Sequence, residues 1–479
     1  MKKAIIFVSI LVLIFTTAVI PASAQDYSSY VDLNCEIDYM VSLDDGSVVI
    51  SKNAQKKAAP ASMTKITTAL VVLQNCPDLN ETVTVSENAI RVLLGTGSSL
   101  SGLKAGEQMS VLNMLHCLLV PSGNDAAVVL AEHVAGSQEK FVQMMNECAQ
   151  KLGCKNTHYD NPHGLDSETH YTTAEDIAII SKAALEYNAF KNIVCEARYT
   201  LPATNMNKER TLINTNSMLN SAYITYYRSF VKGIKTGHTD DAGYCVATYA
   251  SKDGYNYLAV AMNGDYRDSD NDNIQENQAF MDSIRMYEWA FANLSYELVA
   301  PKDMMVAEVG INYSWKTDHI QLKPKEDFRT LVPTGTDEGS VLIEPIEKPD
   351  TVDAPVKAGD VACKAKVIYA DTEIATIDLV YSQSVSKNYL LYAWSLLMRL
   401  LSSTVFKIIL VLAVAGVAIY IGLVMRSNAV RKKKKNQLKI VKINDMEKAQ
   451  NTKKQDRNYK PRHKKIPSCT LLCGRDSFI

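Results

Sequence analysis

Three short motifs carry side chains that together could activate a serine hydroxyl. In chain order they are Ser62-Met63-Thr64-Lys65, Ser122-Gly123-Asn124 and Lys235-Thr236-Gly237. Each motif alone is weak evidence, because a short pattern with free positions occurs by chance in many chains of this length. The ordered set, however, predicts a single active site built around a nucleophilic serine.

The first motif places a potential base one helical turn from a hydroxyl. An apolar run over residues 64–73 predicts a helix, and the Pro-Ala pair before Ser62 puts this serine near the helix N-terminus. Residues three apart share a helix face, so the Lys65 amine should reach the Ser62 hydroxyl. Lysine can accept that proton only if its pKa falls towards neutrality, which burial, the helix N-terminus and the like charge of Lys235 would favour.

The second motif interrupts an apolar stretch. Residues 111–120 and 126–134 predict two helices, and the turn between them carries Ser122 and Asn124. The Ser122 hydroxyl could relay a proton to a leaving group, and the Asn124 amide could hold a substrate carbonyl or the lysine. Both residue types are also good helix N-caps, a structural role that is compatible with the catalytic one.

The third motif precedes a predicted β-hairpin. β-rich runs over residues 244–250 and 255–262 flank a Lys-Asp-Gly turn. Lys235, Thr236 and Gly237 should therefore lie on or beside an edge strand. Such a strand can pair with an extended peptide by main-chain hydrogen bonds, while the lysine and threonine side chains face an anionic group.

The glycine of the third motif predicts a close approach between backbone and substrate. Gly237 has no side chain to prevent it. The backbone N–H groups of Ser62 and His238 could then form an oxyanion hole, in which each donor typically contributes about 3 to 4 kcal/mol.

These motifs resemble those of a known family. Over roughly residues 30–385 the chain is similar to the low-molecular-mass penicillin-binding proteins, which are serine D-alanyl-D-alanine carboxypeptidases. The supporting stretches are Gly95-Thr96-Gly97-Ser98-Ser99-Leu100, Asn161-Pro162-His163-Gly164-Leu165, His170-Tyr171-Thr172-Thr173-Ala174 and Lys235-Thr236-Gly237-His238-Thr239. The resemblance implies an α/β (α+β) serine transpeptidase/β-lactamase-like domain, with an antiparallel sheet flanked by helices.

The resemblance also implies a role for each candidate residue. Ser62 would be the acylated nucleophile, Lys65 the general base and Ser122 the proton relay. The peptide and its terminal carboxylate would be positioned by Asn124, Lys235, Thr236, Gly237 and His238. The implied reaction is hydrolysis of the terminal D-Ala-D-Ala bond of peptidoglycan stem peptides, with β-lactam antibiotics as covalent inhibitors. No cofactor, metal ion or nucleic-acid partner is implied.

Three alternatives use similar residues. A β-lactamase usually carries Glu-x-x-Leu-Asn between the second and third motifs, whereas this chain has Glu209-Arg210-Thr211-Leu212-Ile213, and Gly123 stands where that class usually has Asp. We therefore expect slow deacylation and inhibition by β-lactams. An endopeptidase acting on peptide cross-links would use the same residues as a carboxypeptidase. A cell-wall binding protein with vestigial catalysis would not need the complete proton-transfer set.

One departure from the family concerns the substrate carboxylate. Some relatives carry an arginine shortly before the last motif, but this chain reads Asn214-Thr215-Asn216-Ser217-Met218-Leu219 there. Thr236, Thr239 or Arg228 could replace that arginine, and the sequence leaves the choice open. We leave Arg228 out of the predicted site.

A zinc enzyme must also be considered. His163, Asp166 and His170 lie close in sequence, and zinc-dependent D,D-carboxypeptidases exist. Loop histidines are more often hydrogen-bonded structure than ligands, and the chain has no His-Glu-x-x-His motif. We therefore expect no functional metal.

Apolar segments near both ends predict export and anchoring in the cell membrane. Residues 1–24 read as a signal peptide with a small-residue cleavage site after Ala24. Residues 405–425 are long enough to span a membrane, and the basic cluster from Arg431 to Lys435 predicts a cytoplasmic C-terminus. The catalytic part would then face outward, and residues 384–404 could lie along the outer membrane surface.

Charge follows the same division. Residues 426–479 hold 17 Lys and Arg against 4 Asp and Glu, whereas residues 25–425 hold 32 against 48. The basic tail could therefore contact anionic lipid headgroups, or it could be a solvated and disordered flank.

The exported part should contain two domains. Residues 25–297 form the predicted peptidase domain, and residues 298–383 read as a small β-sandwich spacer. The spacer shows short β-rich runs at 305–311, 361–369 and 374–380, with a Pro- and Asp-rich stretch at 345–355. Eight cysteines fall in the exported part, several within apolar patterns, so we expect them to be mostly unpaired and buried.

Overall fold

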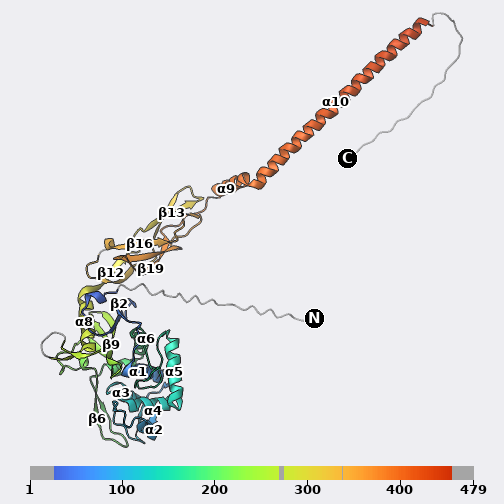
Figure 1. Cartoon of the computed structure of the whole chain (residues 1–479). Helices are drawn as coiled ribbons and strands as arrows, with labels where there is room; N and C mark the ends of the chain where they lie inside the picture. The colour runs from blue at the N-terminus through green and yellow to red at the C-terminus, as the bar shows by residue number, and fades with distance from the viewer. Residues whose placement is uncertain (1–25, 269–273, 337, 456–479) are drawn as a thin grey trace, which may run out of the picture. The chain divides into compact units, whose positions relative to one another are not determined.

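The computed structural model describes residues 26–268, 274–336 and 338–455 (Figure 1). The predicted signal peptide lies outside these residues, as does the tail beyond residue 455. The chain divides into two compact units, and the boundary in the sequence lies between Ser386 and Lys387.

A five-stranded antiparallel sheet forms the centre of the peptidase domain. Its strand order is β2-β1-β9-β8-β7, and every neighbouring pair is antiparallel. The strands are β1 (Ile37–Ser42), β2 (Val48–Lys52), β7 (Val231–Thr239), β8 (Gly243–Lys252) and β9 (Tyr255–Gly264). The predicted edge position of the third motif is therefore confirmed, because β7 is an outer strand.

The β8–β9 hairpin was predictable from its turn. Asp253 and Gly254 have φ values of 52° and 89°. Positive φ at two successive residues is the geometry of a type I′ turn, which matches the twist of paired strands and favours Asp-Gly.

Helices cover both faces of this sheet, as predicted. Alternate residues of β9 pack into two separate cores: Leu258 and Val260 join the core that includes α6, and Tyr257 and Ala259 join the core that includes α8. The helices of the domain are α1 (Thr64–Asn75), α2 (Glu87–Arg91), α3 (Val111–Leu119), α4 (Asn124–Ala135), α5 (Gln138–Lys151), α6 (Ala174–Leu185), α7 (Asn188–Val194) and α8 (Gln278–Asn293).

The first motif lies on the most enclosed helix. α1 contacts α3, α4, α5 and α6, and every residue from Thr64 to Val72 is buried. Its polar side chains are hydrogen-bonded inside the core: the Thr67 hydroxyl lies 2.7 Å from the Tyr159 hydroxyl, and Thr68 donates to the Pro162 carbonyl at 2.6 Å. A helix held on all sides positions its N-terminal residues rigidly.

Three short two-stranded sheets complete the peptidase domain. They pair β3 with β4, β5 with β6 and β10 with β11. Their strands are β3 (Thr82–Thr84), β4 (Gln108–Ser110), β5 (Arg198–Leu201), β6 (Arg210–Ile213), β10 (Tyr266–Arg267) and β11 (Glu276–Asn277).

The following domain is all-β, as predicted. β12 (Leu294–Ala300) pairs with β15 (Phe328–Pro333), and a six-stranded sheet has the order β16-β18-β19-β14-β13-β17. The strands of the larger sheet are β13 (Ala307–Asn312), β14 (His319–Pro324), β16 (Val341–Ile346), β17 (Thr351–Asp353), β18 (Val361–Tyr369) and β19 (Thr372–Tyr381).

The Pro- and Asp-rich stretch over residues 345–355 is not simply a separator. It contributes the end of β16 and all of β17, which form the two edges of the larger sheet. An edge strand tolerates Pro345 because a missing N–H there need not cost a ladder hydrogen bond.

The second unit consists of α9 (Tyr389–Ser402) and α10 (Thr404–Gln455). α10 is long and apolar enough to cross a membrane, with a mean hydropathy of 2.9 in its most apolar window. The helix continues through the basic cluster to Gln455, so of the two alternatives for the tail, a disordered flank does not hold as far as residue 455. Lysine, arginine and glutamine are good helix formers, which explains the continuation.

Every cysteine in the described part of the chain is unpaired, as predicted. Most of them are buried within the hydrophobic cores, where a free thiol behaves as a small apolar group. They are Cys35, Cys76, Cys117, Cys148, Cys154, Cys195, Cys245 and Cys363.

Candidate active site

The first motif brings an amine and a hydroxyl into direct contact. A single 3₁₀ turn (Ala61–Met63) precedes α1 and contains Ser62. The Lys65 Nζ donates to the Ser62 Oγ at 2.8 Å and to the backbone carbonyl of His163 at 2.6 Å. This is the contact that the spacing of the motif predicts.

Burial changes the acid–base properties of Lys65. Its side chain is fully enclosed, and the pKa of its amine is lowered well below the usual range. Burial is the largest cause, the positive charge of Lys235 adds to it, and the carboxylate of Asp125 opposes it. A neutral amine beside Ser62 is what a general base requires.

Lys235 is a second buried lysine beside Lys65. It is 1% exposed, and burial lowers the pKa of its amine to about 7. The amine donates to the Thr236 carbonyl at 3.0 Å and to the Thr215 hydroxyl at 3.5 Å. Among the residues that the structure describes, neither Lys65 nor Lys235 forms an ion pair, so this corner of the domain favours an anion.

The second motif lies in a tight turn between α3 and α4. Ser122 has a φ of 65° and is 3% exposed. α4 begins at Asn124 with Gly123 as its N-cap, so neither polar residue of the motif acts as a side-chain cap. The Asn124 Oδ1 is buried without a hydrogen-bond partner.

Gly123 lies where no side chain fits. A Cβ atom at this position would lie 1.9 Å from the Ser101 hydroxyl and 2.7 Å from the Cys117 carbonyl. The neighbouring Asp125 holds the Ser101 loop in place, because its carboxylate accepts hydrogen bonds from the Ser101 N–H at 2.9 Å. The aspartate that β-lactamases usually carry in place of Gly123 would therefore require this loop to move.

The third motif lies against the first. A Cβ atom on Gly237 would lie 3.0 Å from the Pro60 carbonyl and 3.2 Å from the Ser62 backbone nitrogen. The absence of a side chain thus lets β7 approach the turn that carries the serine. His238 follows directly on the same strand.

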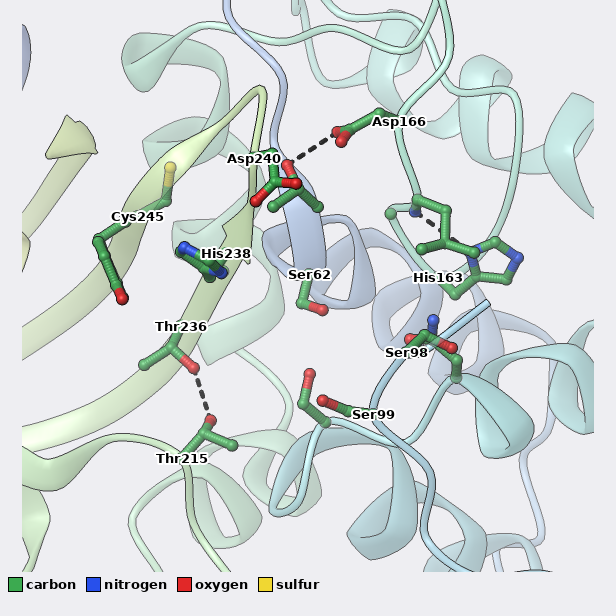
Figure 2. Close-up of a pocket in the computed structure, with 18 of the residues that line it drawn as sticks. Ser62, Ser98, Ser99, His163, Asp166, Thr215, Thr236, His238, Asp240 and Cys245 are labelled. Atoms are coloured by element: carbon green, nitrogen blue, oxygen red, sulfur yellow. Dashed lines mark hydrogen bonds between the residues drawn. The ribbon is translucent and has the colours of Figure 1, made fainter. Parts of the chain in front are cut away.

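Residues of all three motifs line one cavity of about 600 Å³ (Figure 2). Six of the eight predicted site residues reach its surface, while the two lysines lie buried beside it. Those that line it are Ser62, Ser122, Asn124, Thr236, Gly237 and His238. The loops at 96–99 and 163–166, whose sequences contributed to the family resemblance, complete much of its wall.

Thr215 was missed as a site residue. Its hydroxyl lies 2.6 Å from the Thr236 hydroxyl, and both face the cavity in Figure 2. Thr215 belongs to the stretch in which some relatives carry the carboxylate-binding arginine. Its place in that stretch was the one sequence feature that could have identified it as a site residue. Arg228 instead pairs with Glu288 at 2.7 Å, and Thr239 donates to Asp166 at 3.0 Å.

The two loop histidines are engaged in neutral hydrogen bonds. The Asp160 N–H donates to His170 Nδ1 at 3.0 Å, so His170 Nε2 carries the proton and donates to the Thr64 hydroxyl at 2.8 Å. His163 Nδ1 accepts from the Leu165 N–H at 3.3 Å. Burial, the largest cause, lowers the pKa of His163 to about 3 and that of His170 to about 4.

Because the pKa values of these two histidines are lowered, we expect the folded chain to lose stability in mild acid. The unfolded chain binds protons at histidine near pH 6.5, whereas the folded chain does not until about pH 4. The free energy of unfolding should therefore fall as the pH drops from 6.5 towards 4. The urea midpoint of the full chain in detergent, measured at pH 7 and pH 5, tests this expectation.

A matched pair of variants identifies the source of that loss. His170→Gln should weaken the pH dependence of the urea midpoint, while His319→Gln, at an exposed position of β14, should leave it in place. An equal pH dependence in wild type and His170→Gln would contradict the assignment.

Two stretches of the chain match known protein families. Residues 25–266 match the peptidase S11 family, described as D-alanyl-D-alanine carboxypeptidase, and residues 296–387 match the C-terminal domain of penicillin-binding protein 5.

Individual relatives agree with these matches. D-alanyl-D-alanine carboxypeptidase DacF of Bacillus subtilis is 33% identical over 324 residues, which cover 67% of this chain and 78% of that protein. DacA of Escherichia coli is 34% identical over 243 residues, which cover 48% of this chain and 57% of that protein. Among solved structures, penicillin-binding protein 5 from Haemophilus influenzae has a TM-score of 0.57 at 26% identity, covering 74% of this chain and 98% of its own.

Proposed function

Because this chain belongs to the peptidase S11 family of D-alanyl-D-alanine carboxypeptidases, we propose that it removes the terminal D-alanine from peptidoglycan pentapeptides through an acyl-enzyme on Ser62. The observation that carries the proposal is the 2.8 Å contact between Lys65 Nζ and Ser62 Oγ in a corner with two buried lysines. It supplies a nucleophile, a base of lowered pKa and a site for an anion.

Acylation begins with proton transfer across that contact. The neutral Lys65 amine takes the Ser62 proton as Oγ attacks the carbonyl carbon between the last two alanines. The backbone N–H groups of Ser62 and His238 stabilise the oxyanion. As the tetrahedral intermediate collapses, the C–N bond breaks, Ser122 passes its proton to the departing amine and takes in return the proton held by Lys65, and D-alanine leaves.

Deacylation reverses the roles with water as the nucleophile. Water attacks the Ser62 ester, its proton passes to the Lys65–Ser122 pair, and Ser62 Oγ recovers a proton as the shortened peptide departs. No described carboxylate contacts Ser62 or Lys65. A β-lactam, which retains its leaving group after ring opening, should therefore stay attached for a long time.

The edge strand sets the direction in which the peptide binds. An extended substrate adds to β7 by main-chain hydrogen bonds. Its terminal carboxylate lies at Lys235 and Thr236, and its scissile bond lies beside Gly237, where the strand meets Ser62. The unpartnered Asn124 Oδ1 can accept a substrate N–H from the opposite wall.

The apolar helix supports a proposal for where the protein lies in the cell. We propose that residues 405–425 of α10 span the cell membrane once, with the basic residues from Arg426 on in the cytoplasm and the peptidase domain on the extracytoplasmic face. α9 then lies along the membrane surface, and the basic extension contacts anionic lipid headgroups.

Covalent labelling tests the proposed function. The full chain in detergent is incubated with fluorescent penicillin, digested, and mapped by mass spectrometry; D-alanine release is then followed with a pentapeptide and with a cross-linked peptide dimer. One label on the peptide that contains Ser62, with faster release from the pentapeptide, supports the proposal. Labelling without D-alanine release, or no labelling, contradicts it.

Thr215 should contribute to binding of the substrate carboxylate. Thr215→Val removes a hydroxyl that contacts both Thr236 and Lys235, so the KM for the pentapeptide should rise about 10-fold with kcat little changed. D-alanine release at varied peptide concentration measures both constants. Thr211→Val, at an exposed position of β6 outside the cavity, is the matched control.

A peptide with a C-terminal amide separates recognition from a general disturbance of the site. It lacks the charge that Thr215 helps to hold, so Thr215→Val should cost this peptide little. Equal losses with the acid and the amide would rule out a role in carboxylate recognition.

A further inference from the structure

We propose that Cys76, Glu81 and His133 form a binding site for one Zn²⁺ ion on the peptidase domain, away from the cavity. A sulfur, a carboxylate oxygen and an imidazole nitrogen of these residues lie within 4.8 Å of one another. Cysteine, histidine and glutamate are ligands that zinc prefers, and three protein ligands with one water is a common zinc arrangement.

The three side chains converge on one point. His133 Nε2 lies 3.0 Å from Glu81 Oε1, and the Cys76 thiol also interacts with Glu81. Tetrahedral zinc, with bonds of about 2.0 to 2.3 Å, holds its ligand atoms roughly 3.3 to 3.7 Å apart. Small side-chain rotations therefore suffice to bind the ion. Binding releases the thiol proton to solvent and places the Nε2 lone pair of neutral His133 on the metal.

The electrostatic environment favours a cation. α1 ends just before Cys76, and His133 lies in the last turn of α4, so two helix C-termini direct partial negative charge towards the same place. Asp78 adds a nearby carboxylate. Within the described residues Glu81 forms no ion pair with a lysine or arginine, and His133 is its one ion-pair partner.

The site is accessible to an ion from solution. The Glu81 and His133 side chains are 43% and 26% exposed, while Cys76 is 5% exposed.

A second group of ligand-type side chains is less suitable. Cys35, Asp38 and Asp282 are also close together but fully buried. Asp282 is occupied by the backbone N–H of Cys35 at 2.6 Å and by Arg285 at 2.8 Å, and Lys52 lies 3.7 Å from Asp38. Both Asp38 oxygens lack a hydrogen-bond partner, but the charges of Lys52 and Arg285 already lie beside the two carboxylates and disfavour a further cation.

The position of the site gives the metal a structural role. Cys76 and His133 lie at the far ends of the two helices that carry the first and second motifs at their N-termini, α1 and α4, which pack against each other. Each helix has 12 residues and is therefore about 18 Å long. Zinc would fix the two helices relative to each other without contacting the cavity.

Cobalt, which takes the place of zinc and absorbs light, provides the test. The full chain in detergent, without an affinity tag, is titrated with Co²⁺. We expect a thiolate-to-cobalt charge-transfer band and visible bands of four-coordinate cobalt, saturating at one ion per chain and displaced by Zn²⁺. The band should disappear in Cys76→Ser and persist in Cys148→Ser, whose cysteine has a similar exposure of 6%.

Thermal unfolding gives a second measurement on a variant with a partly exposed side chain. Zn²⁺ should raise the melting temperature of the wild type and a chelator should reverse the rise, with penicillin acylation unchanged. His133→Gln, which alters a surface position, should abolish the rise. The absence of a cobalt band, its persistence in Cys76→Ser, or an equal zinc shift in His133→Gln would each overturn the proposal. None of these outcomes depends on the peptidase assignment.

Discussion

Ser62→Ala is expected to abolish covalent labelling by penicillin and to lower the rate of D-alanine release by at least about 10⁴-fold. A serine is a weak nucleophile without a base, and Ser62 is the hydroxyl that contacts the buried Lys65 amine. Removing one member of such a unit leaves only the rate enhancement from binding and the oxyanion hole. Intact mass after incubation with penicillin, and D-alanine release from pentapeptide, measure the two losses.

Two further measurements exclude trivial causes of inactivity. The melting temperature of Ser62→Ala should match that of the wild type within a few degrees, because only one hydroxyl is removed. Ser229→Ala, at an exposed serine outside the cavity, should label normally. Stoichiometric labelling of Ser62→Ala, with the label mapped to Ser122, would refute the assignment of the nucleophile.

The local parts of the site could be predicted from the sequence. The contact between Ser62 and Lys65 follows from their three-residue spacing at a helix start. The edge strand with Lys235 could be located because the Asp-Gly turn after it defines the next hairpin. In both cases the structure depends on residues that are only a few positions apart in the chain. Such local preferences can be recognised in a single sequence.

The three motifs were expected to meet, but several contacts made by the segments between them could not be predicted. The carbonyl that accepts from Lys65 belongs to His163, 98 positions away in the chain. Thr215 reaches Thr236 through a loop with no regular periodicity. The need for glycine at position 123 arises from Ser101 in another loop. Each depends on how the chain packs in three dimensions, which one sequence without relatives does not reveal.

The continuation of α10 illustrates a different limit. Hydropathy locates its apolar part well, because the membrane requires an uninterrupted run of about 20 apolar residues. A basic extension carries no such requirement, and from its charge we considered only contact with lipid headgroups or a disordered flank, not a continued helix. The structure shows a helix to Gln455.

The second large effect is expected for Lys65→Met. The substitution removes the base and should slow acylation by about 10²- to 10⁴-fold, the usual range for general base catalysis. The free energy of unfolding should change little, since an apolar side chain replaces a fully buried amine that is costly to desolvate. Stopped-flow acylation by a chromogenic β-lactam, with the melting temperature measured in parallel, separates catalysis from folding.

The pH dependence of acylation tests why Lys65 can act as a base. Only the neutral amine accepts a proton, so the rate at saturating β-lactam should rise with pH through the lowered pKa of Lys65 and then level off. The charge of Lys235 is one cause of that lowered pKa. Lys235→Met removes this charge, so the pKa of Lys65 should increase and the rising limb should move to higher pH. Lys232→Met, on the same strand and more exposed, is the matched control. A limb that stays in place in Lys235→Met would show that burial alone sets the pKa of the base.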